Sequence, residues 1–162
     1  MATPTDIERI SYGGERGSIQ LGKHREVIQG VGATRTLLAK ESGAMCLFDR
    51  AAGVVYTLPT AVEGMTFDFS TTVTITSNAA KVITASASQF IVGAVQLIIA
   101  ASAVTFGATA NGTTHRAVSS NGTTTGGVIG DQYRLTAISA TQWELRGLLS
   151  ASGTLATPIA TS

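Results

Sequence analysis

Few side chains in this 162-residue sequence could carry out chemistry, and their spacing does not match a known catalytic or metal-binding pattern. The two histidines, His24 and His115, lie far apart in the chain. Neither has a second ligand nearby at the short spacings that zinc sites use. The single cysteine, Cys46, lies in the apolar run Ala44-Met-Cys-Leu-Phe48, so we predict a buried and unreactive thiol. We therefore expect no metal and no cofactor.

The patterns of other enzyme classes are also incomplete. No G-x-S-x-G nucleophile elbow occurs. The segment Gly13-Gly-Glu-Arg-Gly-Ser18 has the composition of a phosphate loop, but it lacks the Lys-Ser/Thr ending and a preceding apolar strand. The carboxylates Glu63 and Asp68 lie in ordinary turn or surface contexts, whereas a glycosidase needs two carboxyl groups facing each other across a cleft. We expect no catalytic residues and a protein that is not an enzyme, with a glycan hydrolase as the enzymatic alternative.

Charged residues that could bind a partner are concentrated at the N-terminus. Residues 1–50 hold 13 of the 21 charged residues, whereas residues 69–130 hold only Lys81 and Arg116. Apolar residues are sparse in residues 1–30, so we expect this segment to be an extended arm that is ordered against something else. A solvated, partly frayed leader is the alternative. The candidate contact residues of the arm are its four cations, Arg9, Arg16, Lys23 and Arg25. Neighbouring glutamates neutralise much of this basic stripe.

The composition of the chain is unusual, and it limits the kind of fold that can position the charged residues. Alanine, glycine, serine and threonine make up 79 of the 162 residues, and only 13% are charged. The 44% hydrophobic content and the net charge of +1 argue against a disordered chain or one that binds nucleic acid through bulk charge. No apolar run reaches the ~20 residues of a membrane helix. One cysteine allows no internal disulfide, and the N-terminus carries no secretion-signal pattern, so we expect synthesis in a reducing cytoplasm.

Short apolar runs between turn signals predict an all-β chain, because the abundant threonine favours strands. Their spacing of roughly 8–12 residues is typical of a sandwich or barrel. We predict a β-sandwich or jelly-roll-like single domain over residues 31–149, after the extended N-terminal arm of residues 1–30. Residues 150–162 are predicted to be a flexible or strand-exchanging C-terminal tail. The predicted strands cover residues 35–39, 45–48, 54–58, 65–69, 72–76, 82–85, 89–92, 95–100, 103–106, 116–119, 132–138 and 142–146.

The sequence also predicts the structure of individual strands and turns. In residues 72–76, Val73 and Ile75 are expected to point to one face of a strand. The dipeptides Asn111-Gly112 and Asn121-Gly122 predict type I′ hairpin turns. Ser139-Ala140 is predicted to join two alternating strands, and Trp143 to lie in the core. The Ala-rich segment 94–103 is predicted to be strand rather than helix, because it is rich in β-branched residues and no helix cap precedes it.

Two segments resemble a module of tailed-bacteriophage structural proteins. The first is Leu37-Leu-Ala-Lys-Glu-Ser-Gly-Ala-Met-Cys-Leu-Phe-Asp-Arg-Ala-Ala-Gly-Val-Val-Tyr-Thr-Leu-Pro59, followed by Gly64-Met-Thr-Phe-Asp-Phe69. The second is Gly130-Asp-Gln-Tyr-Arg-Leu-Thr-Ala-Ile-Ser-Ala-Thr-Gln-Trp-Glu-Leu-Arg-Gly147. Such motifs occur in capsid decoration (cement) proteins and in tail-fibre and head-fibre modules. The longer, charged residues 1–30 depart from the simpler members of the family.

The resemblance implies a β-sandwich that binds the outside of a phage head as a homotrimer and strengthens the shell. Its partners would be other copies of the chain and the major capsid protein, with no nucleic acid and no membrane. It would be made in the host cytoplasm and located on the outer capsid surface of the virion. The compact chain, without a long fibrous repeat, favours a decoration protein. A tail-fibre or head-fibre module that binds a host-surface glycan is the alternative.

Overall fold

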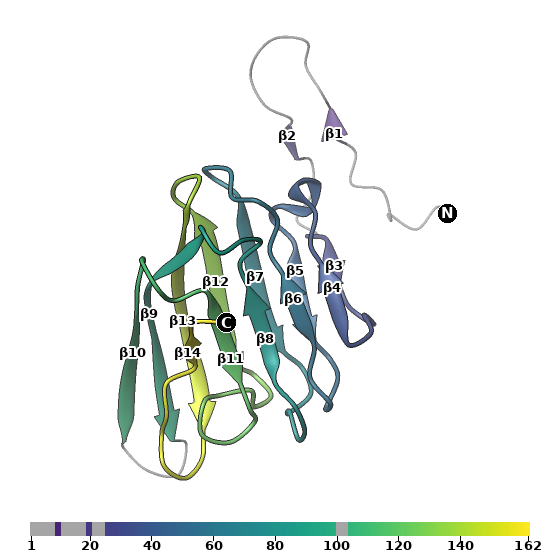
Figure 1. Cartoon of the computed structure of the whole chain (residues 1–162). Helices are drawn as coiled ribbons and strands as arrows, with labels where there is room; N and C mark the ends of the chain where they lie inside the picture. Colours follow the sequence, from purple (N-terminus) through teal and green to yellow (C-terminus); the bar gives the residue numbers. More distant parts are fainter. Residues whose placement is uncertain (1–8, 11–18, 21–24, 100–103) are drawn as a thin grey trace, which may run out of the picture.

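A computed structural model describes residues 9–10, 19–20, 25–99 and 104–162, and the last two of these ranges form an all-β sandwich (Figure 1). The predicted fold class is thereby confirmed. Twelve of the described strands make two sheets, one of seven and one of five strands, that pack face to face. Strands β1 (Arg9–Ile10) and β2 (Ile19–Gln20) pair antiparallel in a two-stranded sheet of their own. A short 3₁₀ helix, η1 (Ala39–Glu41), follows β4.

The larger sheet has the strand order β10-β9-β13-β12-β7-β5-β3. Its strands are β3 (Val27–Ile28), β5 (Met45–Phe48), β7 (Thr66–Thr71), β9 (Phe90–Ile99), β10 (Thr105–Asn111), β12 (Gln132–Ala137) and β13 (Gln142–Ala151). The smaller sheet has the order β14-β11-β8-β6-β4. Its strands are β4 (Thr34–Thr36), β6 (Val55–Thr57), β8 (Ala80–Ile83), β11 (Ala117–Ser120) and β14 (Ile159–Ala160).

The first half of the sandwich is a coil in which successive strands alternate between the two sheets. Strands β3, β5 and β7 stack in parallel in the larger sheet, and β4, β6 and β8 stack in parallel in the smaller one. Val27 pairs with Met45, 18 residues later, and Met45 pairs with Asp68, 23 residues later. Because the coils differ in length, the sequence contains no exact repeat that would reveal them.

The second half of the chain adds antiparallel pairs to this coil. Strands β12 and β13 form a hairpin across residues 138–141, as predicted from Ser139-Ala140, and β12 also pairs antiparallel with β7. Strand β13 lies parallel to β9, and β10 pairs antiparallel with β9 at the edge of the sheet. Strand β11 pairs with both β8 and β14 in the smaller sheet.

Aromatic side chains from both sheets fill the core. Phe69 and Tyr133, neighbours in the larger sheet, stack with ring centroids 5.2 Å apart. Phe48 meets Tyr56 of the smaller sheet edge-on at 5.4 Å. Trp143 is fully buried, so its predicted place in the core is confirmed. Alternation along each strand therefore directs one set of side chains into the core and leaves the other on the outer face.

The predicted strand at residues 72–76 is wrong, since no strand is present there. Val73 is exposed and Ile75 is buried, so the two side chains do not share a face. The backbone of Ile75 instead donates to Gly127 O at 2.9 Å, which ties this segment to a loop. The predicted segments 89–92 and 95–100 merge into the single strand β9, which ends at Ile99. The strand prediction for residues 94–103 is thus confirmed as far as Ile99, and residues 100–103 lie outside the described part of the chain.

The predicted type I′ hairpins at Asn111-Gly112 and Asn121-Gly122 are also wrong. Gly112 and Gly122 have positive φ, but neither asparagine does. The Oδ1 atom of Asn111 accepts the backbone N–H groups of Thr113 and Thr114 at 3.0 Å, and Asn121 makes the equivalent bonds. The asparagine side chains therefore close the two turns, and the strands before and after each turn do not pair with each other.

The ends of the sandwich differ from the expected segment boundaries. Strand β3 lies within the arm predicted for residues 1–30, yet Ile28 is buried against the core. Strand β13 extends past residue 149 to Ala151. In the predicted tail, Ile159 is buried and pairs with Val118 of the same chain. The tail therefore completes the smaller sheet of its own sandwich.

Candidate functional site: an arginine-lined groove on the larger sheet

A groove of about 480 Å³ lies on the outer face of the larger sheet. Its lining comes mainly from β5, β7, β12 and β13, which are consecutive strands of that sheet. The lining residues are Arg25, Met45, Asp68, Phe69, Ser70, Gln132, Tyr133, Arg134, Arg146, Gly147 and Leu148. Strand register places Arg146, Arg134, Asp68 and Met45 in one row across the four strands.

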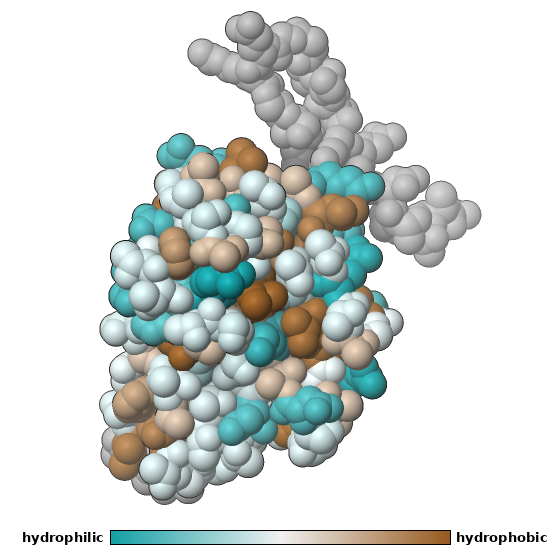
Figure 2. All heavy atoms as spheres, in the orientation of Figure 1, coloured by the Kyte–Doolittle hydropathy of each residue, from teal (hydrophilic) through white to brown (hydrophobic). Residues whose placement is uncertain are grey.

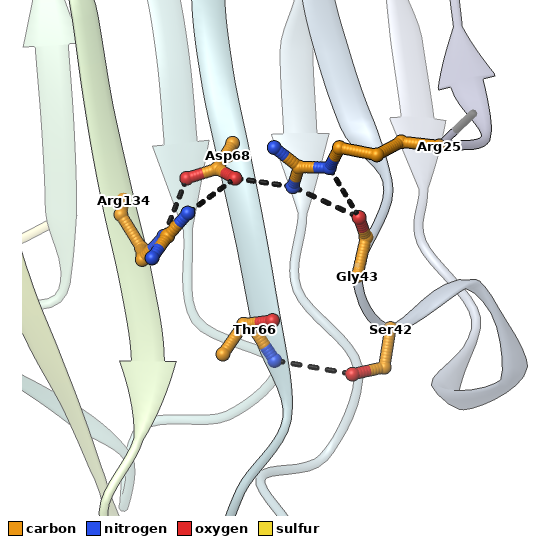
Figure 3. Close-up of polar contacts among 6 residues, drawn as sticks. All are labelled: Arg25, Ser42, Gly43, Thr66, Asp68 and Arg134. Carbon is orange, nitrogen blue, oxygen red and sulfur yellow. Dashed lines mark hydrogen bonds and ion pairs between the residues drawn. The ribbon is translucent and has the colours of Figure 1, made fainter. Parts of the chain in front are cut away.

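Asp68 is the centre of this row, held between two arginines (Figure 3). Arg134 donates from Nε to Oδ1 at 2.6 Å and from Nη2 to Oδ2 at 2.9 Å, which is the two-pronged geometry that suits a carboxylate. Arg25 approaches from the opposite side and donates to Oδ2. The Asp68 side chain is only 16% exposed, whereas those of Arg25 and Arg134 are 38% and 57% exposed.

The electrostatics of Asp68 follow from this arrangement. Burial by itself would raise the pKa of the Asp68 carboxyl. Hydrogen bonds and charges from Arg134 and Arg25 outweigh burial and hold that pKa below its ordinary value. The Asp68 hydrogen bond in turn raises the pKa of Arg134. The carboxylate is therefore ionised at neutral pH, and it balances only one of the two guanidinium charges.

Arg25 fixes the chain just before β3 to the turn that precedes β5. Its Nε and Nη2 atoms donate to Gly43 O at 3.1 and 2.9 Å. Ser42 supports the same turn, since its Oγ accepts the backbone N–H of Thr66 at 3.1 Å (Figure 3). Gly43 N donates to Thr66 O at 2.7 Å. This turn therefore connects the Asp68 strand with the strand that Arg25 precedes.

Arg146 forms the other wall of the groove. It lies directly opposite Arg134 in the β12–β13 register, and its side chain is 78% exposed. Like charges directly opposite each other repel, and Glu144 partly offsets this by accepting a hydrogen bond from Arg146 at 2.6 Å. Leu148, 42% exposed, adds an apolar side chain on the same strand. The groove thus combines an excess of guanidinium groups with apolar surface, an arrangement suited to binding carboxylates on another molecule.

The four cations predicted as contact residues are not brought together by the described structure. Arg25 lies in the groove, where its guanidinium is bound to Asp68 and Gly43 of its own chain. Arg9 lies in β1. Arg16 and Lys23 lie outside the described residues. Sequence reasoning missed Asp68, Arg134 and Arg146 as a cluster. The available signal was that all three occupy outward positions in strands of alternating pattern.

The cysteine and the histidines do not form a cluster among the described residues. Cys46 is fully buried, as predicted, and burial raises the pKa of its thiol to about 12. His115 accepts the backbone N–H of Asn111 through Nδ1 at 3.1 Å, and His24 lies outside the described residues. Within the part of the chain that the structure describes, no three His, Cys, Asp or Glu side chains are grouped closely enough to hold a metal ion.

Comparison with known proteins returned no relative. No protein-family model, no curated protein and no solved structure matches the chain. Among the described residues, no helix is long and apolar enough to cross a membrane.

Proposed function

We propose that the chain is a phage capsid decoration protein, a structural protein that acts by binding. It would occupy the outside of the phage head as a homotrimer, after synthesis in the host cytoplasm, and stabilise the shell. In this proposal the arginine-lined groove faces the major capsid protein. Stabilisation follows from mass action, since a trimer that prefers one state of the shell shifts the shell toward that state.

One observation carries the proposal. The segments that resemble phage structural proteins, residues 37–69 and 130–147, are far apart in the chain but supply β5, β12 and most of β7 and β13, consecutive strands of one sheet. Residues 37–69 also supply β6 of the smaller sheet. Eight of the eleven residues that line the groove belong to these two segments. The two segments that carry the resemblance therefore supply most of the lining of one surface, which is what a shared binding role would require.

The exposed arginines of the groove suit binding to a partner through several weak ion pairs. Arg134 uses two of its three nitrogens for Asp68, and Arg146 is largely exposed beside Glu144. Exposed ion pairs with partner carboxylates would each contribute only about 0–1 kcal/mol. A homotrimer presents three such grooves, so avidity can exceed the affinity of a single groove by orders of magnitude.

Arg25 is removed from the four N-terminal cations that we expect to contact the capsid. Its guanidinium is bound within the chain, so it stabilises the groove wall, and Arg9, Arg16 and Lys23 remain the proposed contacts of the arm. Deletion of residues 1–24 tests the arm without removing Arg25 or the buried Ile28. Unchanged capsid occupancy after this deletion would remove the arm from the proposal and leave the groove as the contact.

The proposal is tested by locating the chain in purified virions by electron microscopy and measuring its occupancy on heads. We expect density on the outer head surface, and we expect Arg146→Glu to lower occupancy at least tenfold by reversing charge at an exposed position of the groove. Lys81→Glu is the matched control, because it makes the same charge change on β8 of the opposite sheet. Its occupancy should equal that of the wild type.

Other outcomes contradict the proposal in distinguishable ways. Density at the tail, or binding to host-surface glycan that Arg146→Glu abolishes, would support the fibre-module alternative. A chain that stays monomeric in solution over a dilution series and binds no heads would contradict the decoration function itself. Equal occupancy of the two charge-reversal variants would keep the function and reject the groove as its surface.

A further inference from the structure

Strand β10 presents the longest unpaired edge among the described strands of the two packed sheets. It runs over seven residues at one end of the larger sheet, opposite the end formed by β3 (Figure 1). The other edge strands, β3, β4 and β14, have two, three and two residues. Exposed edges of this length are sites where another strand can add, and natural proteins usually protect them with charge, proline or a covering segment.

The backbone groups that face outward on β10 can be assigned from the hydrogen bonds at its two ends. Ile99 N donates to Val104 O, and Gly112 N donates to Ile91 O. In an antiparallel ladder, bonded pairs alternate with non-bonded pairs, so the even-numbered residues of β10 bond to β9. Thr105, Gly107 and Thr109 therefore direct their N–H and C=O groups away from the sheet. The next outward N–H, that of Asn111, is bound by His115 and ends the open stretch.

We propose that this edge, residues 105–109, pairs antiparallel with the same edge of a second copy of the chain. If the two-fold axis passes at Gly107, the two glycines face each other and Thr105 faces Thr109 of the second copy. Each of these outward-facing pairs exchanges two backbone bonds, so the pairing satisfies every outward group of the stretch. The larger sheet then continues from one copy into the next.

The side chains favour a second copy over other occupants. Gly107 on the two-fold axis faces its own equivalent, and the residues beside it lie close to theirs, so like charges in this stretch would repel each other across the axis. The sequence Thr105-Phe-Gly-Ala-Thr-Ala-Asn111 contains no charged residue and no proline, and neither does β9 beside it. In Figure 2 the lower left of the molecule, where β10 lies in Figure 1, is mostly white to brown rather than teal. Facing threonines also pair favourably across antiparallel strands.

Gly107→Pro tests the pairing without breaking the sandwich. The outward N–H of Gly107 is not part of the β9 ladder, and proline is tolerated in edge strands at such positions. A Cβ at Gly107 meets no atom within 4 Å. Proline removes the central donor from both copies, so we expect the self-association constant to fall roughly tenfold or more. Gly107→Ala is the matched control, since it adds the Cβ and keeps the N–H.

Native mass measurement over a dilution series separates this inference from the proposed function. If both hold, the wild type forms hexamers or larger assemblies and Gly107→Pro forms trimers. If only the pairing holds, the wild type is a dimer and Gly107→Pro a monomer. Equal masses for the wild type, Gly107→Ala and Gly107→Pro at every concentration would overturn the pairing, whether that mass is trimeric or monomeric.

Hydrogen exchange provides the second readout. The amides of residues 105, 107 and 109 should become protected as the wild type is concentrated, while those of residues 106, 108 and 110 stay protected throughout. In Gly107→Pro the amides of Thr105 and Thr109 should exchange rapidly at all concentrations, with thermal stability retained. Protection of these amides only on addition of a different protein would mean that the edge binds an extended segment of that protein, and it would reject the self-pairing.

Discussion

Replacing Asp68 with asparagine tests whether the arginine clamp stabilises the sandwich. The substitution keeps the size of the side chain and removes the charge that Arg25 and Arg134 share. Charge-assisted hydrogen bonds to a partly buried carboxylate contribute about 1.5–3 kcal/mol, whereas exposed ion pairs contribute about 0–1 kcal/mol. Because both arginines are more than a third exposed, water replaces part of what they lose. We therefore expect a loss of about 2 kcal/mol at neutral pH.

The assay is urea or thermal unfolding followed by the fluorescence of Trp143, the only tryptophan, which is fully buried. A loss of about 2 kcal/mol should lower the thermal midpoint by roughly 4–8 °C in a domain of this size. Glu144→Gln is the matched control, because Glu144 also accepts from an arginine, but that arginine is 78% exposed. The control should change the free energy of unfolding by less than about 0.5 kcal/mol.

The pH dependence gives a second, independent comparison. The pKa of Asp68 is lower in the folded protein than its ordinary value of 3.8, so the unfolded chain binds the proton more tightly. The stabilisation by Asp68 is therefore fully present above that ordinary value and disappears as the pH falls through the lower folded value. The difference between wild type and Asp68→Asn should shrink over the same range. Equal stabilities at neutral pH, or a difference that persists in strong acid, would refute the role assigned to the clamp.

Three further predictions concern other parts of the sandwich. Gly93→Ala should destabilise the fold by about 2 kcal/mol or more in urea unfolding, because Gly93 has φ +116° and a Cβ there would lie 2.4 Å from the carbonyl oxygen of Leu145; Gly107→Ala, in open space, should leave stability unchanged. Cys46 should resist thiol-specific reagents in the native protein and react only on unfolding, since it is fully buried with a pKa of about 12; reaction at the rate of a free thiol would contradict its buried position. Asp131→Ala should lower the free energy of unfolding in urea by about 3 kcal/mol, because this buried carboxylate accepts the backbone N–H groups of Gly127, Val128 and Ser150. A variant as stable as the wild type would show that these three donors bind water instead.

Local patterns in the sequence were sufficient for the parts of the fold that depend on neighbouring residues. The alternation around Trp143 predicts the β12–β13 hairpin and its buried face, and the apolar run around Cys46 predicts a buried strand. The asparagine-glycine turns failed because the asparagine side chain, rather than a second positive φ, closes each turn. The same dipeptide is compatible with both geometries, so its identity alone could not decide between them.

The candidate site could not be predicted because it depends on strand register. Asp68 and Arg134 are 66 residues apart, and Arg25 and Asp68 are 43 residues apart. They meet because β7 lies between β12 on one side and β5 on the other. The parallel coil that fixes these neighbours has turns of unequal length, so no periodic signal marks them. The outward orientation of each side chain was predictable, whereas its neighbours across the sheet were not.

The place of β13 in the larger sheet has a consequence for how the chain folds during synthesis. Strand β13 lies between β9 and β12 in the sheet, although residues 142–151 are synthesised after every other strand of that sheet. The coil from β3 to β8 can assemble early, but the β9–β10 hairpin has no partner strand in its sheet until β13 is available. Contacts between distant segments slow folding, and unpaired strand edges promote aggregation. The β9–β10 hairpin is therefore exposed to aggregation in the nascent chain until β13 has been synthesised.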